Sequence, residues 1–172
     1  MISWLPNMRA YVLAAALGLV GGAASAGSLP EPQGAPILTI TGAMSRADSR
    51  EAVDFDRQML EAIGTVKLRT KTPWYDGVVE FEGVPMTALM EHVGAEGTEV
   101  AAVALNDYEV VIPMADFERF GVILATKRNG KEMPVRDKGP LFIVYPYDSD
   151  PALQADQYYA RSAWQVRTLE IR

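Results

Sequence analysis

The sequence predicts one domain of the α+β class, mainly β, because short strand-like runs far outnumber convincing helices. About eight runs are rich in β-branched residues, whereas only two segments show helical periodicity. The chain of 172 residues is 49% hydrophobic and 22% charged, which is ordinary for a globular domain of this length. No internal repeat or second domain boundary is visible.

The first 26 residues have the layout of a secretory signal peptide. Arg9 is their only charge, an unbroken small and apolar run follows over residues 10–24, and Ala24-Ser25-Ala26 has the small–x–small pattern of a cleavage site. The run falls short of the roughly 20 residues that span a bilayer, which disfavours the alternative of an uncleaved anchor. This segment contains no pair of adjacent arginines, which is the signal for transport of an already folded protein.

We therefore expect a periplasmic or secreted protein, cleaved after Ala26 and without a stable membrane anchor. Residues 27–36 contain three prolines and two glycines and are predicted to form an extended lead-in. The domain itself is predicted over residues 37–172.

Two helices are predicted, each with a start and a stop signal. Asp54–Ile63 has Asp54 as its expected N-cap and ends before Gly64, and Pro85–Val93 begins with proline and ends before Gly94.

Eight strands are predicted around these helices. Gly83 is expected to end one strand, and Lys71–Gly77 is predicted to be a loop because it contains Pro and Asp-Gly. Asn106-Asp107 and Asn129-Gly130 are predicted tight turns, and the wholly apolar Leu141–Tyr145 is expected to be buried on both faces. The strands are Ile37–Thr41, Thr65–Thr70, Val78–Glu82, Val100–Leu105, Tyr108–Ile112, Gly121–Thr126, Leu141–Tyr145 and Trp164–Ile171.

The composition excludes several kinds of site. The chain has no cysteine, so it has no disulfide, no Cys-ligated zinc or iron–sulfur cluster and no thiol nucleophile. His92 is the only histidine, and it is predicted to be a packing or surface residue rather than a catalyst. A net charge of −6 argues against nucleic-acid binding.

Three further groups of residues could each have either a binding role or a purely structural role. Asp148, Asp150 and Asp156 lack the spacing of an EF-hand and are predicted to form a solvated acidic loop. Lys127–Lys138 has a local charge of +3, which favours the charged exterior of a hairpin over an anion site. Several aromatic residues suggest either core-rim packing or a ligand shelf: Trp74, Tyr75, Tyr147, Tyr158, Tyr159 and Trp164.

Four short motifs follow one another along residues 37–171. They are Val66-Lys67-Leu68-Arg69-Thr70, then Phe81-Glu82-Gly83-Val84-Pro85-Met86, then Asn129-Gly130-Lys131-Glu132-Met133-Pro134 with Lys138-Gly139-Pro140-Leu141 and Pro146, and finally Trp164. In order and spacing they resemble the molybdopterin-binding oxidoreductase domain, the family of sulfite oxidase. The resemblance implies the mixed, mainly β fold of sulfite oxidase as a single domain.

The same resemblance implies a molybdenum site that this chain does not reproduce. Family members bind molybdenum through the pterin dithiolene and a cysteine thiolate, and Thr70 is the best match to that cysteine. Lys71-Thr72-Pro73-Trp74 stands where basic residues usually follow, Phe142 stands in place of an arginine, and Ala163 replaces the lysine before Trp164. These departures remove charges that would meet an anionic cofactor or substrate.

The preferred hypothesis is a periplasmic domain of this fold that has lost molybdenum chemistry and binds a small ligand or a periplasmic protein partner. No cofactor is expected, molybdopterin being possible by resemblance alone, and no catalytic or metal-binding residue is assigned. The predicted cleft residues are Thr70, Lys71, Trp74, Tyr75, Tyr108 and Trp164.

Two alternatives stay open. A working molybdopterin-dependent oxidoreductase, or a subunit of one, would need a metal site without cysteine and cations for the cofactor phosphate. The candidate cations are Lys71, Arg136, Lys138 and Arg161. A protein that interacts through its surface would instead expose a large apolar patch away from Thr70.

Overall fold

The computed structural model describes Met1, residues 29–46 and residues 51–172. The expected signal peptide and its cleavage site lie, Met1 apart, outside the described residues. Residues 29–37 form neither helix nor strand. No helix among the described residues is both long and apolar enough to cross a membrane.

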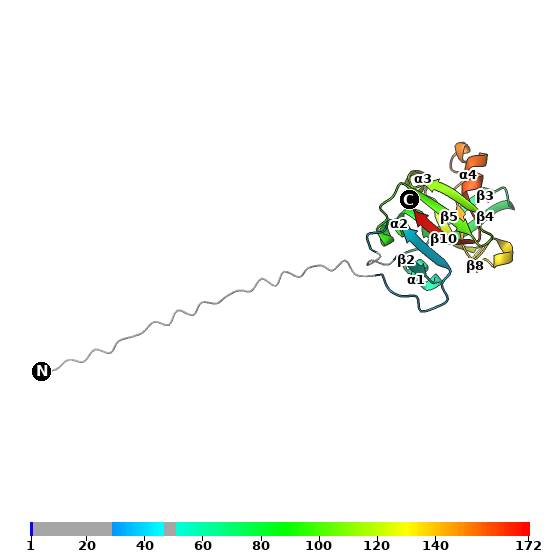
Figure 1. Cartoon of the computed structure of the whole chain (residues 1–172). Helices are drawn as coiled ribbons and strands as arrows, with labels where there is room; N and C mark the ends of the chain where they lie inside the picture. The colour runs from blue at the N-terminus through cyan, green and yellow to red at the C-terminus, as the bar shows by residue number, and fades with distance from the viewer. Residues whose placement is uncertain (2–28, 47–50) are drawn as a thin grey trace.

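The described residues form two five-stranded sheets (Figure 1). The first has the order β2-β1-β10-β5-β6, in which β1 and β10 are parallel and the other neighbours are antiparallel. Its strands are β1 (Leu38–Gly42), β2 (Ala52–Phe55), β5 (Glu99–Ala104), β6 (Glu109–Pro113) and β10 (Val166–Ile171).

The second sheet is antiparallel throughout. Its order is β3-β4-β7-β8, and β9 also pairs with β7. Its strands are β3 (Val66–Thr72), β4 (Tyr75–Pro85), β7 (Ile123–Arg128), β8 (Lys131–Glu132) and β9 (Phe142–Val144).

Four short α-helices and two 3-10 turns connect the strands. The helices are α1 (Arg57–Ala62), α2 (Met86–Val93), α3 (Ala115–Phe120) and α4 (Asp156–Arg161), and the 3-10 turns are Val135–Asp137 and Pro151–Leu153. The prediction of an α+β, mainly β domain is therefore confirmed.

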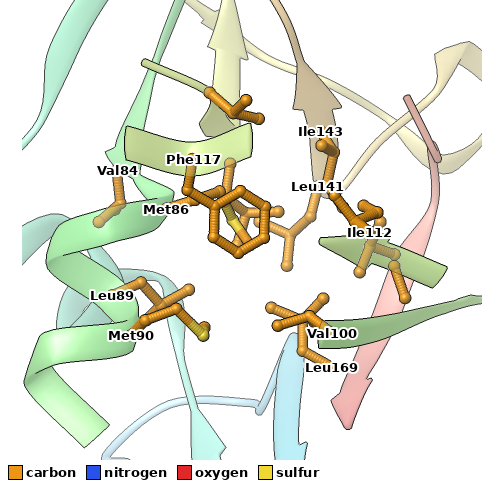
Figure 2. Close-up of a cluster of buried hydrophobic side chains, with 14 of the residues drawn as sticks. Val84, Met86, Leu89, Met90, Val100, Ile112, Phe117, Leu141, Ile143 and Leu169 are labelled. Carbon is orange, nitrogen blue, oxygen red and sulfur yellow. The ribbon is translucent and has the colours of Figure 1, made fainter. Parts of the chain in front are cut away.

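Helix α2 supplies much of the larger hydrophobic core. Its buried residues Met86, Leu89, Met90 and Val93 follow the i, i+3, i+4, i+7 spacing of one helical face. Figure 2 shows Leu89 and Met90 pointing across the core toward Val100 and Leu169, which belong to β5 and β10. Phe117 of α3 and Ile143 of β9 point into the same space. The predicted start and stop of this helix are confirmed, with Gly94 left-handed at φ 65°.

The predictions around α1 were partly wrong. Asp54 is not the N-cap but lies in β2 opposite Thr39, while Asp56 caps the helix by accepting a hydrogen bond from the Met59 amide at 2.8 Å. The helix is consequently shorter than predicted, because pairing of β2 with β1 holds residues 52–55 in extended conformation.

Lys71–Gly77 was predicted to be a loop and is a β-hairpin. Strand β3 runs on to Thr72 and β4 starts at Tyr75, so only Pro73 and Trp74 form the turn. Gly83 does not end its strand either: β4 continues to Pro85 with a register shift at Gly83. A Cβ at this glycine would lie 2.2 Å from the Leu124 carbonyl oxygen, so close approach of β7 requires glycine here.

Four elements of the structure were not predicted from the sequence: β2, β8, α3 and α4. The two predicted turns are correct: Asn106-Asp107 joins β5 to β6, and Asn129-Gly130, with both φ values positive, joins β7 to β8. The prediction for Leu141–Tyr145 is also correct, because every residue in it is buried.

Asp56 connects the lead-in segment to helix α1 through hydrogen bonds, and we expect Asp56→Asn to lower the stability of the fold. Its buried carboxylate accepts hydrogen bonds from the backbone N–H groups of Met59, Gly34 and Gln33, which hold the pKa of Asp56 below its ordinary value. A lowered pKa stabilises the folded state at neutral pH, and this contribution is lost as the pH falls through the lowered value.

Urea unfolding should therefore show Asp56→Asn less stable than the unaltered protein at pH 7, with the difference narrowing in acid. Asp54→Asn is the matched control, because Asp54 is exposed and, among the described residues, accepts only from the Thr39 hydroxyl. A pH-independent difference would contradict the assignment.

Candidate functional site

A pocket of about 320 Å³ opens where two turns of the chain meet helix α4. Trp74 comes from the β3–β4 turn, Asn106 and Tyr108 from the β5–β6 turn, and Tyr159 from α4. The volume is at the lower end for small-ligand sites. We call this cavity the aromatic pocket; its lining is Trp74, Ala104, Asn106, Tyr108, Tyr159, Ala160, Ser162, Ala163 and Trp164.

Trp74 is at the centre of the aromatic packing behind this pocket. Its ring is edge-on to those of Trp164 and Tyr159, with centroids 5.6 and 6.1 Å away, and to Phe142 at 5.4 Å. Trp74 packs against both hydrophobic clusters of the domain. The Trp74 side of the pocket is therefore held in position by packing against the hydrophobic core.

Three side chains of the pocket already form hydrogen bonds within the protein. The Tyr108 hydroxyl donates to the Ala160 carbonyl oxygen at 3.1 Å, and the Asn106 side-chain oxygen accepts from the Tyr108 amide at 3.3 Å. The buried Ser162 hydroxyl donates to the Tyr158 carbonyl oxygen and is hydrogen-bonded to the Tyr147 hydroxyl.

Several donors of the same pocket, by contrast, have no partner among the described residues. They are the indole N–H groups of Trp74 and Trp164, the Tyr159 hydroxyl and the Asn106 side-chain amide. Since no buried side-chain nitrogen or oxygen in the described part of the chain lacks a partner, these donors are open to solvent. The pocket can therefore donate hydrogen bonds to a ligand.

Lys138 covers one face of the pocket wall. Its Nζ lies 3.7 Å from the centroid of the Trp164 ring and 5.6 Å from that of Trp74, which is cation–π geometry. Burial lowers the pKa of Lys138, with Asp137 acting in the opposite direction. Lys138 is left-handed at φ 65°, and its carbonyl oxygen accepts from the Gln165 amide beside Trp164.

Asp137 is already committed to other groups. Both of its carboxylate oxygens accept from the Arg128 guanidinium, at 3.0 and 2.5 Å, and one also accepts from the Tyr75 hydroxyl at 3.1 Å. Burial raises the pKa of Tyr75 to about 12, so its hydroxyl stays protonated at neutral pH. Tyr75, a predicted cleft residue, belongs to this neighbouring network and not to the pocket lining.

Thr70 does not face a cavity. Its side chain is completely buried, and its hydroxyl donates to the Lys71 carbonyl oxygen and accepts from the Asp148 amide, both at 3.1 Å. Thr70 therefore connects β3 to the segment after β9. Thr70, a predicted cleft residue, is therefore not part of the aromatic pocket lining.

Lys71 and Arg161 lie outside the aromatic pocket as well. Lys71 lines a separate hollow of about 270 Å³ with Asp148, whose carboxylate accepts from the Lys71 amide. Arg161 points to the other side of α4, where its guanidinium donates to Asp116 at 2.8 Å. Asp116 also accepts from the buried Tyr145 hydroxyl, and burial strongly raises the pKa of Tyr145.

Arg136 is exposed and contributes to no cavity described above. Of the nine predicted site residues, the structure brings Trp74, Tyr108 and Trp164 together in one pocket and stacks Lys138 on its wall. The remaining five lie elsewhere, because ion pairs and strand pairing that the sequence does not reveal determine their direction.

His92 and the acidic loop have structural surroundings. The His92 ring is edge-on to Phe55, and burial lowers its pKa. Asp150 caps the 3-10 turn at Pro151–Leu153 by accepting from the Ala152 amide. Within the described ranges no three His, Asp or Glu side chains are grouped so as to hold a metal ion.

Some pocket residues were not predicted as site residues. Asn106 was predicted only as part of a tight turn, Ser162 carries no motif, and Tyr159 was considered only as one of six aromatic residues of a possible ligand shelf. A larger, more open depression of about 690 Å³ between α2 and α3 contains none of the predicted residues.

Comparison with known proteins gives one family. The family model described as the oxidoreductase molybdopterin binding domain matches residues 51–148. The match includes Trp74 and Tyr108 and ends before Tyr159 and Trp164, so it covers one side of the aromatic pocket. A search of curated proteins found no match.

The hydrogen bonds of Thr70 lead to a stability prediction. Thr70→Val keeps the shape of the side chain but leaves the Asp148 amide without its partner, so we expect a loss of about 1–3 kcal/mol in the free energy of unfolding. Urea denaturation measures it. Thr168→Val is the control substitution of the same type, since Thr168 also lies in a strand, β10, but its hydroxyl forms no hydrogen bond with any described residue. Equal stability of both variants would contradict the role of Thr70.

Proposed function

The chain belongs to the oxidoreductase molybdopterin-binding domain family, and we propose that it is an exported member that binds a small ligand in the aromatic pocket without molybdenum redox chemistry. The observation that carries the proposal is the pocket itself. Its lining includes three of the predicted cleft residues, presents four aromatic side chains and contains no thiol.

The donors at the expected metal position do not fit molybdenum. A thiolate is a soft ligand that suits this metal, whereas a hydroxyl is hard and barely acidic. Thr70 matches the position of the ligand cysteine by resemblance, yet its hydroxyl is held between two backbone groups and does not reach a cavity. The chain has no cysteine elsewhere that could take its place.

The residues at two further positions also favour loss of the original chemistry. Phe142 stands where the resemblance expects an arginine, and it is fully buried against Trp74 and Phe81. Ala163 stands where a lysine is expected and lines the pocket. A charged side chain at the site of Phe142 would be costly without a partner, so this part of the domain has become apolar.

The four candidate cations do not form an anion site. Lys71 and Arg136 lie outside the pocket, Arg161 is paired with Asp116, and Lys138 is stacked on Trp164. A cofactor phosphate would need several of these charges to converge. Their dispersal supports a ligand smaller than a phosphorylated cofactor.

A protein segment is a second candidate for the occupant of the pocket. Beyond Met1, six large apolar side chains of the described residues are exposed, and Leu105, Tyr108 and Val111 among them lie on the β5–β6 hairpin at or near the pocket. Exposed apolar side chains next to a pocket favour binding of a protein segment that covers the side chains and the pocket together. Leu105→Asp should then weaken the binding of a partner while small-ligand binding stays unchanged, as titration of each would measure.

Elemental analysis tests the loss of molybdenum. We expect protein purified from the native periplasm to contain no stoichiometric molybdenum and to begin at Gly27 by mass spectrometry. Oxidised pterin released from the protein would be detected by its fluorescence. Near-stoichiometric molybdenum would contradict the proposal and require a metal site without cysteine.

A single substitution that introduces a cysteine at position 70 should not restore sulfite oxidase activity. Thr70→Cys restores the ligand type, but the side chain is buried and the surrounding charges are absent, so we expect no sulfite oxidation above background. Steady-state assay with an artificial electron acceptor measures this, and circular dichroism verifies the fold. Turnover in this variant would show that the rest of the site is intact.

A further inference from the structure

The four aromatic residues of the pocket raise the question of whether its ligand is a cation, an anion or a neutral molecule. Pockets walled by Trp and Tyr often recognise quaternary ammonium groups, because the ring faces attract a cation. Trp74, Tyr108, Tyr159 and Trp164 would form such a wall. Two features of this pocket oppose a cation: the position of Lys138 and the kind of polar group that is left unpaired.

The first feature is that the protein supplies its own cation. The Lys138 ammonium lies 3.7 Å from the Trp164 ring centroid and is also within cation–π range of Trp74. Its neighbour Asp137 is held by Arg128 and Tyr75, so no ion pair with a described residue neutralises Lys138. A charged group of the same sign entering the pocket would be repelled.

The second feature is the absence of acids from the lining. None of the nine lining residues is acidic, although the whole chain carries a net charge of −6. The two carboxylates next to Tyr108 in the sequence are both paired, Asp107 with Arg167 at 2.7 Å and Glu109 with Arg172 at 2.9 Å. Among the unpaired polar groups, the indole N–H groups of Trp74 and Trp164 and the Asn106 side-chain amide can only donate, whereas the Asn106 side-chain oxygen already accepts from the Tyr108 amide.

From these features we propose that Lys138 makes the aromatic pocket selective for planar ligands that carry a carboxylate or a neutral acceptor group, and that it excludes cations. This inference rests on the proposed function, because it specifies the ligand of the same pocket. The volume of about 320 Å³ accommodates a ligand of about one or two rings. Lys138 is here a specificity residue acting partly through the Trp164 ring on which it lies.

Three probes of nearly equal size separate the charge of a ligand from its shape: benzoate, benzamide and benzylammonium. Trp74 and Trp164 are the only tryptophans after residue 26, and both line the pocket, so tryptophan fluorescence of the processed protein reports on it directly. Calorimetry provides the affinities. We expect benzoate and benzamide to bind, with benzoate favoured over benzylammonium by on the order of tenfold.

Removal of the Lys138 charge should abolish this preference. Lys138→Gln is expected to reduce the benzoate-to-benzylammonium ratio by on the order of tenfold, while benzamide binding changes little. Lys138→Met, which keeps an apolar stem on Trp164, should do the same and separates charge from packing. Lys131→Gln is the matched control, because Lys131 is an exposed lysine seven residues earlier, in β8, and its side chain pairs with no described residue.

The outcomes distinguish the two proposals. Benzylammonium binding as tightly as benzoate, or an equal shift in Lys131→Gln, would overturn the role of Lys138 while the pocket remains a ligand site. Failure of all three probes to bind would contradict the proposed function itself, and the inference with it.

Discussion

The rest of this domain depends on a strand that has no face open to water. Leu141, Ile143 and Tyr145 belong to the larger hydrophobic cluster, and Phe142 and Val144, which alternate with them, belong to the smaller one. Both edges of β9 are also used: β7 pairs with one, and the Ile143 amide donates to the Ala163 carbonyl oxygen on the other. Such a strand can lie only between two cores, so it fixes where they meet. Trp164 bridges to Phe142 at this junction, and the aromatic pocket opens beside it.

Sequence patterns predicted the parts of the fold that are encoded locally. Helix α2 has a full apolar stripe and a glycine stop, and Asn129-Gly130 specifies a tight turn by its own backbone preference. The failures have a common cause in long-range pairing. Lys71–Gly77 contains loop-forming residues, yet β3 and β4 pair almost to the turn, and α3 and α4 are too short, at six residues each, for a periodic pattern.

The site was predictable in part for the same reason. Aromatic side chains in turns tend to gather at a core rim, and Trp74, Tyr108 and Trp164 do so. The direction of a charged side chain depends on its partner, and the partner of Arg161 is Asp116, 45 residues earlier in the chain. Similarly, Thr70 is turned inward by its hydrogen bond with Asp148, 78 residues later. No local pattern in the sequence carries this information.

The position of β10 has a consequence for how the domain forms. This strand follows all the others in the chain, yet it lies in the middle of the first sheet between β1 and β5, as Figure 1 shows. Its parallel pairing with β1 joins residues more than a hundred positions apart, and such contacts pay a large loop-closure entropy before they stabilise anything. During synthesis from the N-terminus the first sheet therefore stays open until the last strand has left the ribosome.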